Sequence, residues 1–341
     1  MDDTPVRVAI NGLGRIGRSV LRAYFERYDL GALEIVALNE LADIQTLAHL
    51  TRYDSTHGKF PGKVEILGGQ LVINDSTMHV SQQPDIRLLP WRELGVDLVL
   101  ECTGAFTDRT TAELHVAQGA KRVLLSQPAE SDVDATIVYG INHQMLKPEH
   151  TIVSNASCTT NCIVPVIAAL HEALGVSSGI LTTIHSAMND QPVIDAYHHT
   201  DLRKTRSAFQ SIIPVDTGLA RGIERVLPEL TGRFEAQAMR VPTVNVSAID
   251  LTVVVEKAVT REEVNAVLRA AAAASTPGVL DCTDEPLASC DFNHDSRSAI
   301  IDLGQTRVSG KHLVKVLTWF DNEWGYANRM LDVARLMAAQ L

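Results

Sequence analysis

Two side chains near the middle of the chain, Cys158 and His185, have the types and surroundings needed for nucleophilic catalysis. Cys158 stands in the run SNASCTTNC, where small polar residues precede an apolar helical stretch, so we expect it at a helix N-terminus. The helix dipole and the backbone amides there stabilise a thiolate, which predicts that the pKa of Cys158 falls from about 8.5 toward roughly 3.5–7.5. His185 ends the strand-like run ILTTIH, and a histidine beside a cysteine can act as its activating base.

The same residues allow a plainer interpretation. A free cysteine is most often a small buried hydrophobic residue, and most of the twelve histidines will be ordinary surface or core residues. Cys162 follows Cys158 by one helical turn, so we expect it to face inward and to be structural. The spacing alone leaves both interpretations of Cys158 open.

A glycine-rich turn near the start of the chain predicts a dinucleotide site. Gly12, Gly14 and Gly17 follow an apolar strand and open a helix. The first glycine permits the tight turn, the second lets the backbone approach a pyrophosphate, and the third allows close helix–sheet packing. Glu40 ends the next strand, where its carboxylate would bind a ribose diol and repel the 2′-phosphate of NADP. The motif therefore favours NAD over a turn without a ligand.

Basic residues in an acidic chain indicate where an anionic substrate would bind. Arg203, Lys204 and Arg206 lie in one short run, and Arg240 lies in the segment MRVPT. Such a run is most often a solvated surface, but inside a long loop it is also a candidate phosphate site. Thr217 precedes a helical run and could donate its hydroxyl to the same anion. A thiolate, a nicotinamide and an anion site together predict the oxidation of a phosphorylated aldehyde.

The elements that must position these residues differ between the two halves of the chain. Up to Asn155, apolar runs alternate with amphipathic stretches, which predicts βαβ units on a parallel sheet. In this half we expect strands at 6–11, 34–38, 96–101 and 122–126, helices at 15–28, 43–52 and 109–118, and a hairpin within 62–82.

Beyond Asn155 the pattern indicates an antiparallel sheet. Alternation over 244–255, with Val244, Val246 and Ala248 against Ser247, Asp250 and Thr252, predicts a strand with one covered face. Residues 186–215 read as a long polar loop of functional type. In this half we expect helices at 159–174, at 261–274 and from 323 onward, and further strands at 179–185 and 312–319. The predicted fold is α/β: a Rossmann-type doubly wound parallel sheet domain at 1–157, plus an α+β catalytic domain with a mostly antiparallel sheet at 158–320.

Composition limits the class of protein. A chain of 341 residues suggests roughly two domains, and 45% hydrophobic with 21% charged residues is ordinary globular material. The net charge of −11 disfavours nucleic acid and anionic membranes as partners. The five cysteines form no CxxC pair and no zinc-finger spacing, so we expect no disulfide framework and no metal. No signal-peptide pattern or membrane-length apolar run is present, which favours a cytoplasmic location.

Four segments spread along the chain resemble the glyceraldehyde-3-phosphate dehydrogenases: AINGLGRIGR, CTGAF at 102–106, SNASCTTNC and DNEWGYANR at 321–329. The resemblance covers essentially the whole chain. It implies that Cys158 is the nucleophile and His185 its base, that the C-terminal helix, residues 321–341, completes the NAD domain, and that the protein is a homotetramer. It also implies cofactor-binding roles for Arg15, Ile16, Thr103, Ser126 and Asn322, besides Gly12, Gly14, Gly17 and Glu40.

Departures from the common pattern point to one branch of that family. The segments IHSAMNDQPVIDAYH, LPWREL and IIPVDTGLA resemble the enzymes that oxidise D-erythrose 4-phosphate in pyridoxal 5′-phosphate synthesis. NELAD replaces the usual NDLTD after the second strand, and Met188 stands where the family has a phosphate-binding threonine. The alternative is a phosphorylating, glycolytic glyceraldehyde-3-phosphate dehydrogenase.

The resemblance also implies a set of residues that hold the substrate or the acyl-transfer anion. A loop arginine of the family falls on Lys204, but one extra residue among His198-His199-Thr200 leaves Arg203 as the other candidate, and Lys is not equivalent to Arg at a bidentate site. The implied set is Ser157, Thr159, Arg203 or Lys204, Thr217, Gly218 and Arg240.

Overall fold

The computed structural model describes residues 5–31, 33–198 and 200–341 and divides into two compact units. The first unit consists of two segments, the residues up to Ser157 and the C-terminal segment Tyr326–Leu341. The second unit is Cys158–Gly325. Residues 1–4 and His199 lie outside the described residues. The predictions for the N-terminus of the first domain and for the absence of a signal-peptide pattern include residues 1–4.

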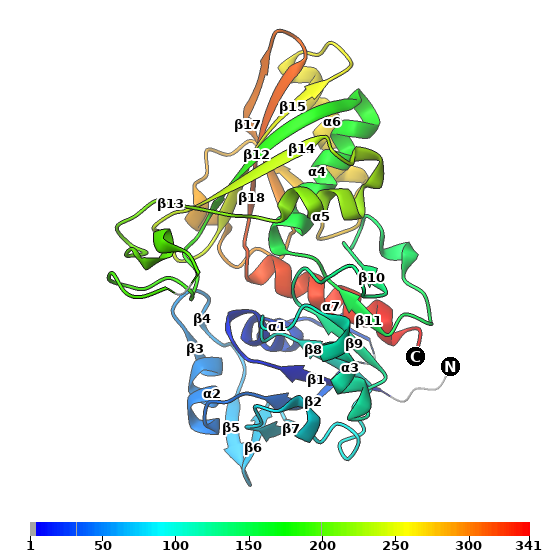
Figure 1. Cartoon of the computed structure of the whole chain (residues 1–341), viewed down its shortest axis with the longest axis vertical. Helices are drawn as coiled ribbons and strands as arrows, with labels where there is room; N and C mark the ends of the chain where they lie inside the picture. Colours follow the sequence, from blue (N-terminus) through cyan, green and yellow to red (C-terminus); the bar gives the residue numbers. More distant parts are fainter. Residues whose placement is uncertain (1–4, 32, 199) are drawn as a thin grey trace. The chain divides into compact units, whose positions relative to one another are not determined.

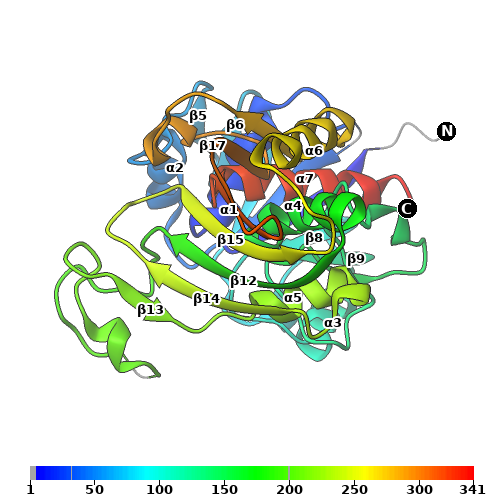
Figure 2. The same ribbon diagram turned by 90° about the horizontal axis from the view of Figure 1, so that it is seen from above.

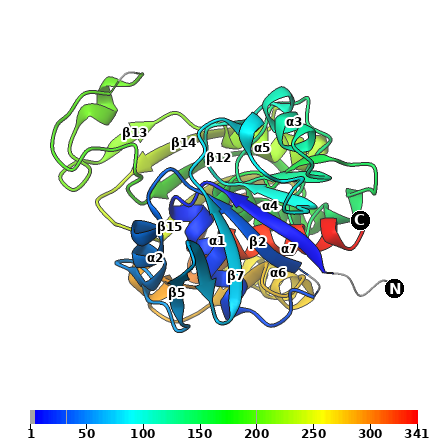
Figure 3. The same cartoon turned by 90° about the horizontal axis from the view of Figure 1, so that it is seen from below.

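The first unit is built on a nine-stranded sheet with the order β10-β11-β9-β8-β1-β2-β7-β6-β5. Every neighbouring pair from β10 to β7 is parallel, and β7, β6 and β5 form an antiparallel extension. Figure 3 shows β1, β2 and β7 of this sheet side by side. The strands of this sheet are β1 (Val6–Asn11), β2 (Leu33–Asn39), β5 (Val64–Leu67), β6 (Gln70–Ile73), β7 (Ser76–Ser81), β8 (Leu98–Glu101), β9 (Arg122–Leu125), β10 (Ala135–Thr136) and β11 (Ile152–Ser154).

Helices alternate with strands along the first unit, as the sequence pattern predicts, and the last helix of the chain completes it. The helices are α1 (Arg15–Glu26), α2 (Ile44–Arg52), α3 (Arg109–Ala117) and α7 (Trp324–Ala338), and a small separate pair is formed by β3 (Tyr53–Asp54) and β4 (Gly58–Lys59). Asp43 caps α2 by accepting a hydrogen bond from the Thr46 amide, which satisfies one of the otherwise unpaired N-terminal N–H groups. Helix α1 ends two residues before the predicted Tyr28, because Arg27 has extended backbone angles.

The segment 62–82 forms more than the single hairpin predicted for it. Gly68 and Gly69, both with positive φ, close the β5–β6 hairpin. A second turn at Asn74–Asp75 then returns the chain as β7, which pairs with β2 in parallel and so joins the main sheet. The predicted excursion is therefore an extension of the sheet rather than an appendage.

The second unit is a seven-stranded sheet with the order β13-β14-β12-β15-β18-β17-β16. Strands β12, β13, β14, β15, β17 and β18 are labelled in Figure 1. Only the β12–β14 and β16–β17 pairs are parallel. The strands are β12 (Val176–His185), β13 (Ile213–Val215), β14 (Phe234–Arg240), β15 (Ser247–Val255), β16 (Leu280–Thr283), β17 (Ala299–Ser309) and β18 (Leu313–Phe320).

Three helices pack in the second unit: α4 (Cys158–Leu174), α5 (Leu219–Val226) and α6 (Arg261–Ala274). Helix α4, which contacts β12, β15 and β18, is apolar over most of its length, and ten of its residues are buried. Helix α6 has the predicted bounds, and a capping box between Thr260 and Glu263 fixes its start. Figure 2 shows β14, β12 and β15 side by side, with residues 186–198 and 200–212 extending away from this sheet.

These two sheets confirm the predicted α/β fold class, and two further local details differ from the predictions. Strand β15 begins at Ser247; Ser247 is buried rather than outward-facing, and Val244, expected on the covered face, is exposed. The loop at 186–215 is less polar on its surface than predicted, because Val193, Ile194 and Tyr197 are largely exposed there.

Candidate functional site

Cys158 is the first residue of α4, where the sequence predicted a helix N-terminus. The chain reaches it through Ala156, whose φ of 56° places a non-glycine residue in the left-handed region. The hydroxyl of Tyr326 donates to the Ala156 carbonyl (2.8 Å), which helps to hold this turn. Backbone and surroundings together fix the place from which Cys158 projects.

His185 lies within reach of this cysteine. The Cys158 Sγ–His185 Nε2 distance is 3.8 Å. Nδ1 of His185 lies 2.8 Å from the Ser186 carbonyl, which can only accept a hydrogen bond, so Nδ1 carries the proton of the neutral ring. Nε2 is therefore the atom free to take a proton, and it is the atom that faces Sγ.

The protonation states differ from the sequence-based expectation. Burial raises the pKa of Cys158 to about 12, and the nearby Asp321 and Glu323 act in the same direction. The amides of Cys158 and Thr159 lower this pKa, but by less than burial raises it. The predicted fall in the Cys158 pKa was therefore wrong, because desolvation of the thiolate outweighs its stabilisation by the amides.

Burial, followed by the adjacent Arg240, lowers the pKa of His185. A neutral imidazole thus faces a neutral thiol, which is the starting arrangement for general-base activation. Cys162 is fully buried, as expected, and burial holds the pKa of its thiol well above the usual range.

Arg240 lies next to His185 and shares one carboxylate with Lys204. Arg240 ends β14 and occupies the position paired with His185 at the end of β12. Asp190, from the loop after β12, accepts hydrogen bonds from Nη1 of Arg240 and from Nζ of Lys204 (3.0 Å). Two cations held by one anion leave a local excess of positive charge beside His185. Asp190 was missed by the sequence analysis; its signal was an acidic residue five positions after the predicted base.

The other members of the predicted basic cluster are placed differently. Arg203 is exposed, and Arg206 pairs with Asp195 (3.1 Å). Met188 is also exposed, and its backbone N–H donates to Gln191 Oε1 (3.0 Å). Within the cluster at 203–206, Lys204 is therefore the side chain that shares a carboxylate with Arg240.

The hydroxyl and amide residues of the implied anion set lie at helix starts. Ser157 and Thr159 flank Cys158 at the start of α4. Gly218 caps α5, and the hydroxyl of Thr217 accepts a hydrogen bond from the Leu219 amide (3.2 Å), close to the cap-like role predicted for it.

Asn322 belongs to the second unit and is held by two serines. Its Oδ1 accepts hydrogen bonds from Ser186 Oγ (3.1 Å) and from Ser247 Oγ (2.8 Å). The hydroxyl of Ser247 in turn accepts from the Ser186 amide, which fixes the direction of its own donation. The side-chain amide nitrogen of Asn322 is thereby oriented as the donor of this group.

The glycine turn in the first unit fits a dinucleotide. Gly12 has a φ of 87°, and a Cβ there would lie 2.8 Å from Thr103. A Cβ on Gly17 would lie 2.0 Å from the Gly12 carbonyl oxygen, whereas a Cβ on Gly14 would meet nothing within 4 Å. The first and third glycines are therefore required by packing, and the space at the second is open for a ligand.

Glu40 lies over this turn, as predicted. Its carboxylate accepts hydrogen bonds from the amides of Leu13 (2.7 Å) and Leu41 (2.7 Å). These bonds hold a negative group beside the start of α1, whose N-cap residue Gly14 supplies no side-chain hydrogen bond. An acidic group in this place fits a ribose diol and not a 2′-phosphate.

The remaining predicted cofactor residues border the same edge of the sheet. Arg15 begins α1, followed by Ile16, and its guanidinium pairs with Asp54 (2.5 and 3.1 Å). Thr103 and Ser126 follow the ends of β8 and β9. Ligands of open parallel sheets bind at this carboxyl edge.

Comparison with known proteins agrees with this geometry. Residues 6–109 match the family model "Glyceraldehyde 3-phosphate dehydrogenase, NAD binding domain", and residues 157–322 match "Glyceraldehyde 3-phosphate dehydrogenase, C-terminal domain". The chain belongs to the glyceraldehyde-3-phosphate dehydrogenase family. It is thus an NAD-dependent oxidoreductase of a family that acts on aldehydes and binds phosphorylated sugars.

No helix among the described residues has the length and apolarity to span a bilayer. Within the same residues, no group of three or more His, Cys, Asp or Glu side chains is arranged to hold a metal ion.

Proposed function

We propose that this dehydrogenase oxidises D-erythrose 4-phosphate to 4-phosphoerythronate with NAD⁺, as a D-erythrose-4-phosphate dehydrogenase serving pyridoxal 5′-phosphate synthesis in the cytoplasm. The observation that carries the proposal is Met188, which stands at the position of the family's phosphate-binding threonine and whose side chain has no hydrogen-bond donor. The segments IHSAMNDQPVIDAYH, LPWREL and IIPVDTGLA support the same branch.

The first step is attack of Cys158 Sγ on the substrate aldehyde. Nε2 of His185 takes the thiol proton as the C–S bond forms, because Nδ1 is already protonated and held by the Ser186 carbonyl. The resulting thiohemiacetal oxygen develops negative charge beside the Cys158 amide and the protonated His185. A raised thiol pKa makes this proton transfer necessary at neutral pH.

Oxidation then yields a thioester on Cys158. The glycine turn and Glu40 would hold NAD⁺, which would supply the hydride acceptor for the thiohemiacetal carbon. A water molecule attacks the thioester carbonyl, the C–S bond breaks, and His185 is placed to take the proton from that water. Aldehyde, NAD⁺ and water thus give a carboxylate, NADH and two protons, with no inorganic phosphate consumed.

We assign the substrate phosphate to Arg240 and Lys204. Both are cationic and both already contact one carboxylate, that of Asp190, which supports their assignment to an anionic oxygen group. The other anion-binding residues in this proposal are Ser157, Thr159, Thr217 and Gly218. Arg203 lies on the exposed surface of the loop between β12 and β13. The cofactor-binding residues are the glycine turn, Arg15, Ile16, Glu40, Thr103, Ser126 and Asn322.

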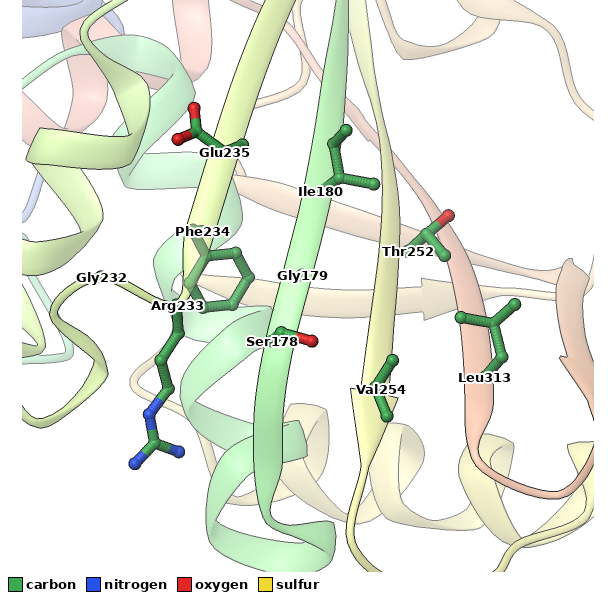
Figure 4. Close-up of a pocket in the computed structure, with 10 residues that line it drawn as sticks. All are labelled: Ser178, Gly179, Ile180, Gly232, Arg233, Phe234, Glu235, Thr252, Val254 and Leu313. Atoms are coloured by element: carbon green, nitrogen blue, oxygen red, sulfur yellow. The ribbon is translucent and has the colours of Figure 1, made fainter.

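We also propose that the enzyme is a homotetramer. The sheet of the second unit exposes Ile180 (55%), Leu313 (43%) and Val254 (39%), which line a shallow depression with Phe234 (Figure 4). Exposed apolar side chains that gather on one face are typical of subunit contacts. Ile180→Glu is expected to lower the mass measured by analytical ultracentrifugation, whereas an unchanged mass would contradict the use of this face.

The deciding experiment compares substrates and the need for phosphate. NADH formation is measured with erythrose 4-phosphate and with glyceraldehyde 3-phosphate, each with and without inorganic phosphate. We expect a much larger kcat/KM for the four-carbon substrate and no phosphate requirement. Preference for the three-carbon substrate with absolute phosphate dependence would show a glycolytic enzyme instead.

A further inference from the structure

A chain of buried polar groups crosses the carboxyl ends of three neighbouring parallel strands in the first unit. Asn39 ends β2, Asn11 ends β1 and Glu101 ends β8, and these side chains are 6%, 2% and 1% exposed. Asn39 Nδ2 donates to Asn11 Oδ1 (2.7 Å), and Asn11 Nδ2 donates to Glu101 Oε2 (2.5 Å). A core position is costly for such groups unless every one is hydrogen-bonded.

The series of hydrogen-bonded side chains continues from Glu101 to His115 in α3. Oε2 of Glu101 lies 3.0 Å from Nε2 of His115, and the indole nitrogen of Trp91 donates to Nδ1 of His115 (3.0 Å). Because an indole N–H can only donate, Nδ1 must accept, and the proton of the neutral ring lies on Nε2. His115 therefore donates to Glu101, and Trp91 fixes this direction.

The other carboxylate oxygen of Glu101 holds the loop that follows β8. Oε1 accepts hydrogen bonds from the backbone N–H of Thr103 (2.8 Å) and from its hydroxyl. The hydroxyl of Thr103 accepts from the Ala105 amide (3.2 Å), so its own proton is directed at Glu101. All four contacts of Glu101 are thus donations to it, the pattern of a carboxylate.

Thr103 in turn lies against the glycine turn. A Cβ on Gly12 would approach the backbone and side chain of Thr103 to 2.8 Å, so the two segments already touch closely. The turn itself is tied to the strands that carry the buried chain, because the Gly12 amide donates to the Asn39 carbonyl (2.8 Å). A shift of Thr103 would therefore disturb the backbone that faces the dinucleotide.

At both ends of this hydrogen-bonded series of side chains, the partners are groups whose donor and acceptor roles cannot be exchanged. At one end, Asn39 donates to the Gln83 carbonyl (2.9 Å) and accepts from the Gln83 amide (2.9 Å). At the other end stands the indole of Trp91. If an asparagine amide rotated by 180° or the imidazole changed tautomer, two hydrogen-bond donors would face each other. The side chain at position 101 must therefore present two acceptor oxygens.

We propose that Glu101 is a positioning residue for NAD: it joins Asn11, His115 and Thr103 into one directional network that holds the glycine turn and the loop after β8 in the conformation that binds the dinucleotide. Glu101 acts through Thr103 and Asn11. This inference rests on NAD binding alone and is independent of the sugar phosphate that the enzyme oxidises.

The test is Glu101→Gln, which keeps the size of the side chain and replaces one acceptor oxygen with a donor. We expect the Kd for NAD, measured by isothermal titration calorimetry, to rise about tenfold or more, a loss of about 1.4 kcal/mol. With NAD saturating, kcat should stay within about threefold of the wild type, because the groups that react are unchanged. Hydrogen exchange at the Thr103 amide should become faster.

Asp332→Asn is the matched control. Asp332 is a buried carboxylate of the same unit that accepts a hydrogen bond from Arg27 (2.7 Å) and forms an ion pair with Arg329 (2.7 Å). Arg27 caps the C-terminal end of α1, ~18 Å along that helix from the glycine turn. This variant should lower Tm as a buried charge replacement does, yet leave the Kd for NAD unchanged.

Trp91→Phe provides a second variant that does not depend on the folding of Glu101→Gln. It frees Nδ1 of His115, so the imidazole can change tautomer and Glu101 loses one donor. We expect a Kd for NAD between those of the wild type and Glu101→Gln. In the double variant, the rise in the Kd for NAD should be smaller than the product of the rises in the two single variants. The reason is that Nε2 of His115 can then accept a hydrogen bond from the new amide at position 101.

Two results would overturn the proposal. One is a Kd for NAD within twofold of the wild type in Glu101→Gln, or in Trp91→Phe where the first variant does not fold. The other is an equal rise in Kd in Asp332→Asn, which would show that lost stability alone weakens binding.

Discussion

Arg240 stands directly across from His185 in the parallel pairing of β14 with β12. The two side chains therefore leave adjacent strand ends on the same edge of the sheet, one as a permanent cation and the other as a neutral imidazole. Arg240 lowers the pKa of His185, and Asp190, which pairs with Arg240, raises it. The anion site and the base are thus coupled electrostatically as well as by position.

This coupling predicts opposite pH shifts in two variants. Activity requires neutral His185 and is lost as pH falls through its pKa, which burial and Arg240 hold below the ordinary value of about 6.5. Arg240→Gln removes a lowering influence, so the acid limb of kcat/KM should move to higher pH. Asp190→Asn removes a raising influence, so the limb should move to lower pH.

The measurement uses a short aldehyde without a phosphate, because Arg240 is also assigned to the substrate phosphate. Profiles of log kcat/KM against pH are compared at constant ionic strength. If both variants moved the acid limb in the same direction, the limb would not belong to His185.

His185→Asn tests the base itself. The Asn side chain cannot take the thiol proton, and burial holds the pKa of that thiol at about 12. We expect kcat to fall by about 10²–10⁴, the usual contribution of a general base, with an unchanged Kd for NAD. Cys158→Ala should abolish turnover and also bind NAD normally. Normal turnover in either variant would contradict the proposed mechanism.

The sequence predicted the backbone of the site better than its electrostatics. The glycine motif and the run SNASCTTNC each define a strand–turn–helix or loop–helix junction, so local pattern suffices to place Gly12, Gly14 and Cys158. A pKa depends on desolvation from all directions, which no local pattern contains. That is why the helix N-terminus at Cys158 was identified and the sign of its pKa shift was not.

Long-range polar networks were equally hidden from the sequence. Asn11, Asn39 and Glu101 each appear as a single polar residue at the end of an apolar run, separated by about 28 and 62 positions along the chain. Their hydrogen bonds follow from the strand order β2-β1-β8, which the sequence pattern does not specify. The feature of the sequence that could have indicated this network is a polar residue at the carboxyl end of each buried strand. In parallel sheets, ligands bind at these strand ends.

Lys204→Gln tests the anion site. Lys204 Nζ and Arg240 converge on Asp190, whereas Arg206 pairs with Asp195 on an exposed part of the loop. We expect Lys204→Gln to raise the KM for the sugar phosphate about tenfold, consistent with the loss of a charge-assisted contact. Arg206→Gln, the matched control, should change KM by less than about twofold, because exposed ion pairs contribute little. A larger effect at Arg206 than at Lys204 would reassign the phosphate contact.

Glu40 predicts the choice between NAD and NADP. Its carboxylate is held over the glycine turn by the amides of Leu13 and Leu41, so its negative charge cannot move away from an incoming 2′-phosphate. Glu40→Gln removes the charge and keeps the side-chain length. We expect the Kd for NADP to fall and the Kd for NAD to rise, so that their ratio changes by about tenfold or more. Asp43→Asn removes a nearby charge of the same sign that is committed to capping α2 through Thr46, and it should leave the ratio unchanged. An unaltered ratio in Glu40→Gln, or an equal change in Asp43→Asn, would show that cofactor choice is set by overall charge or by another residue.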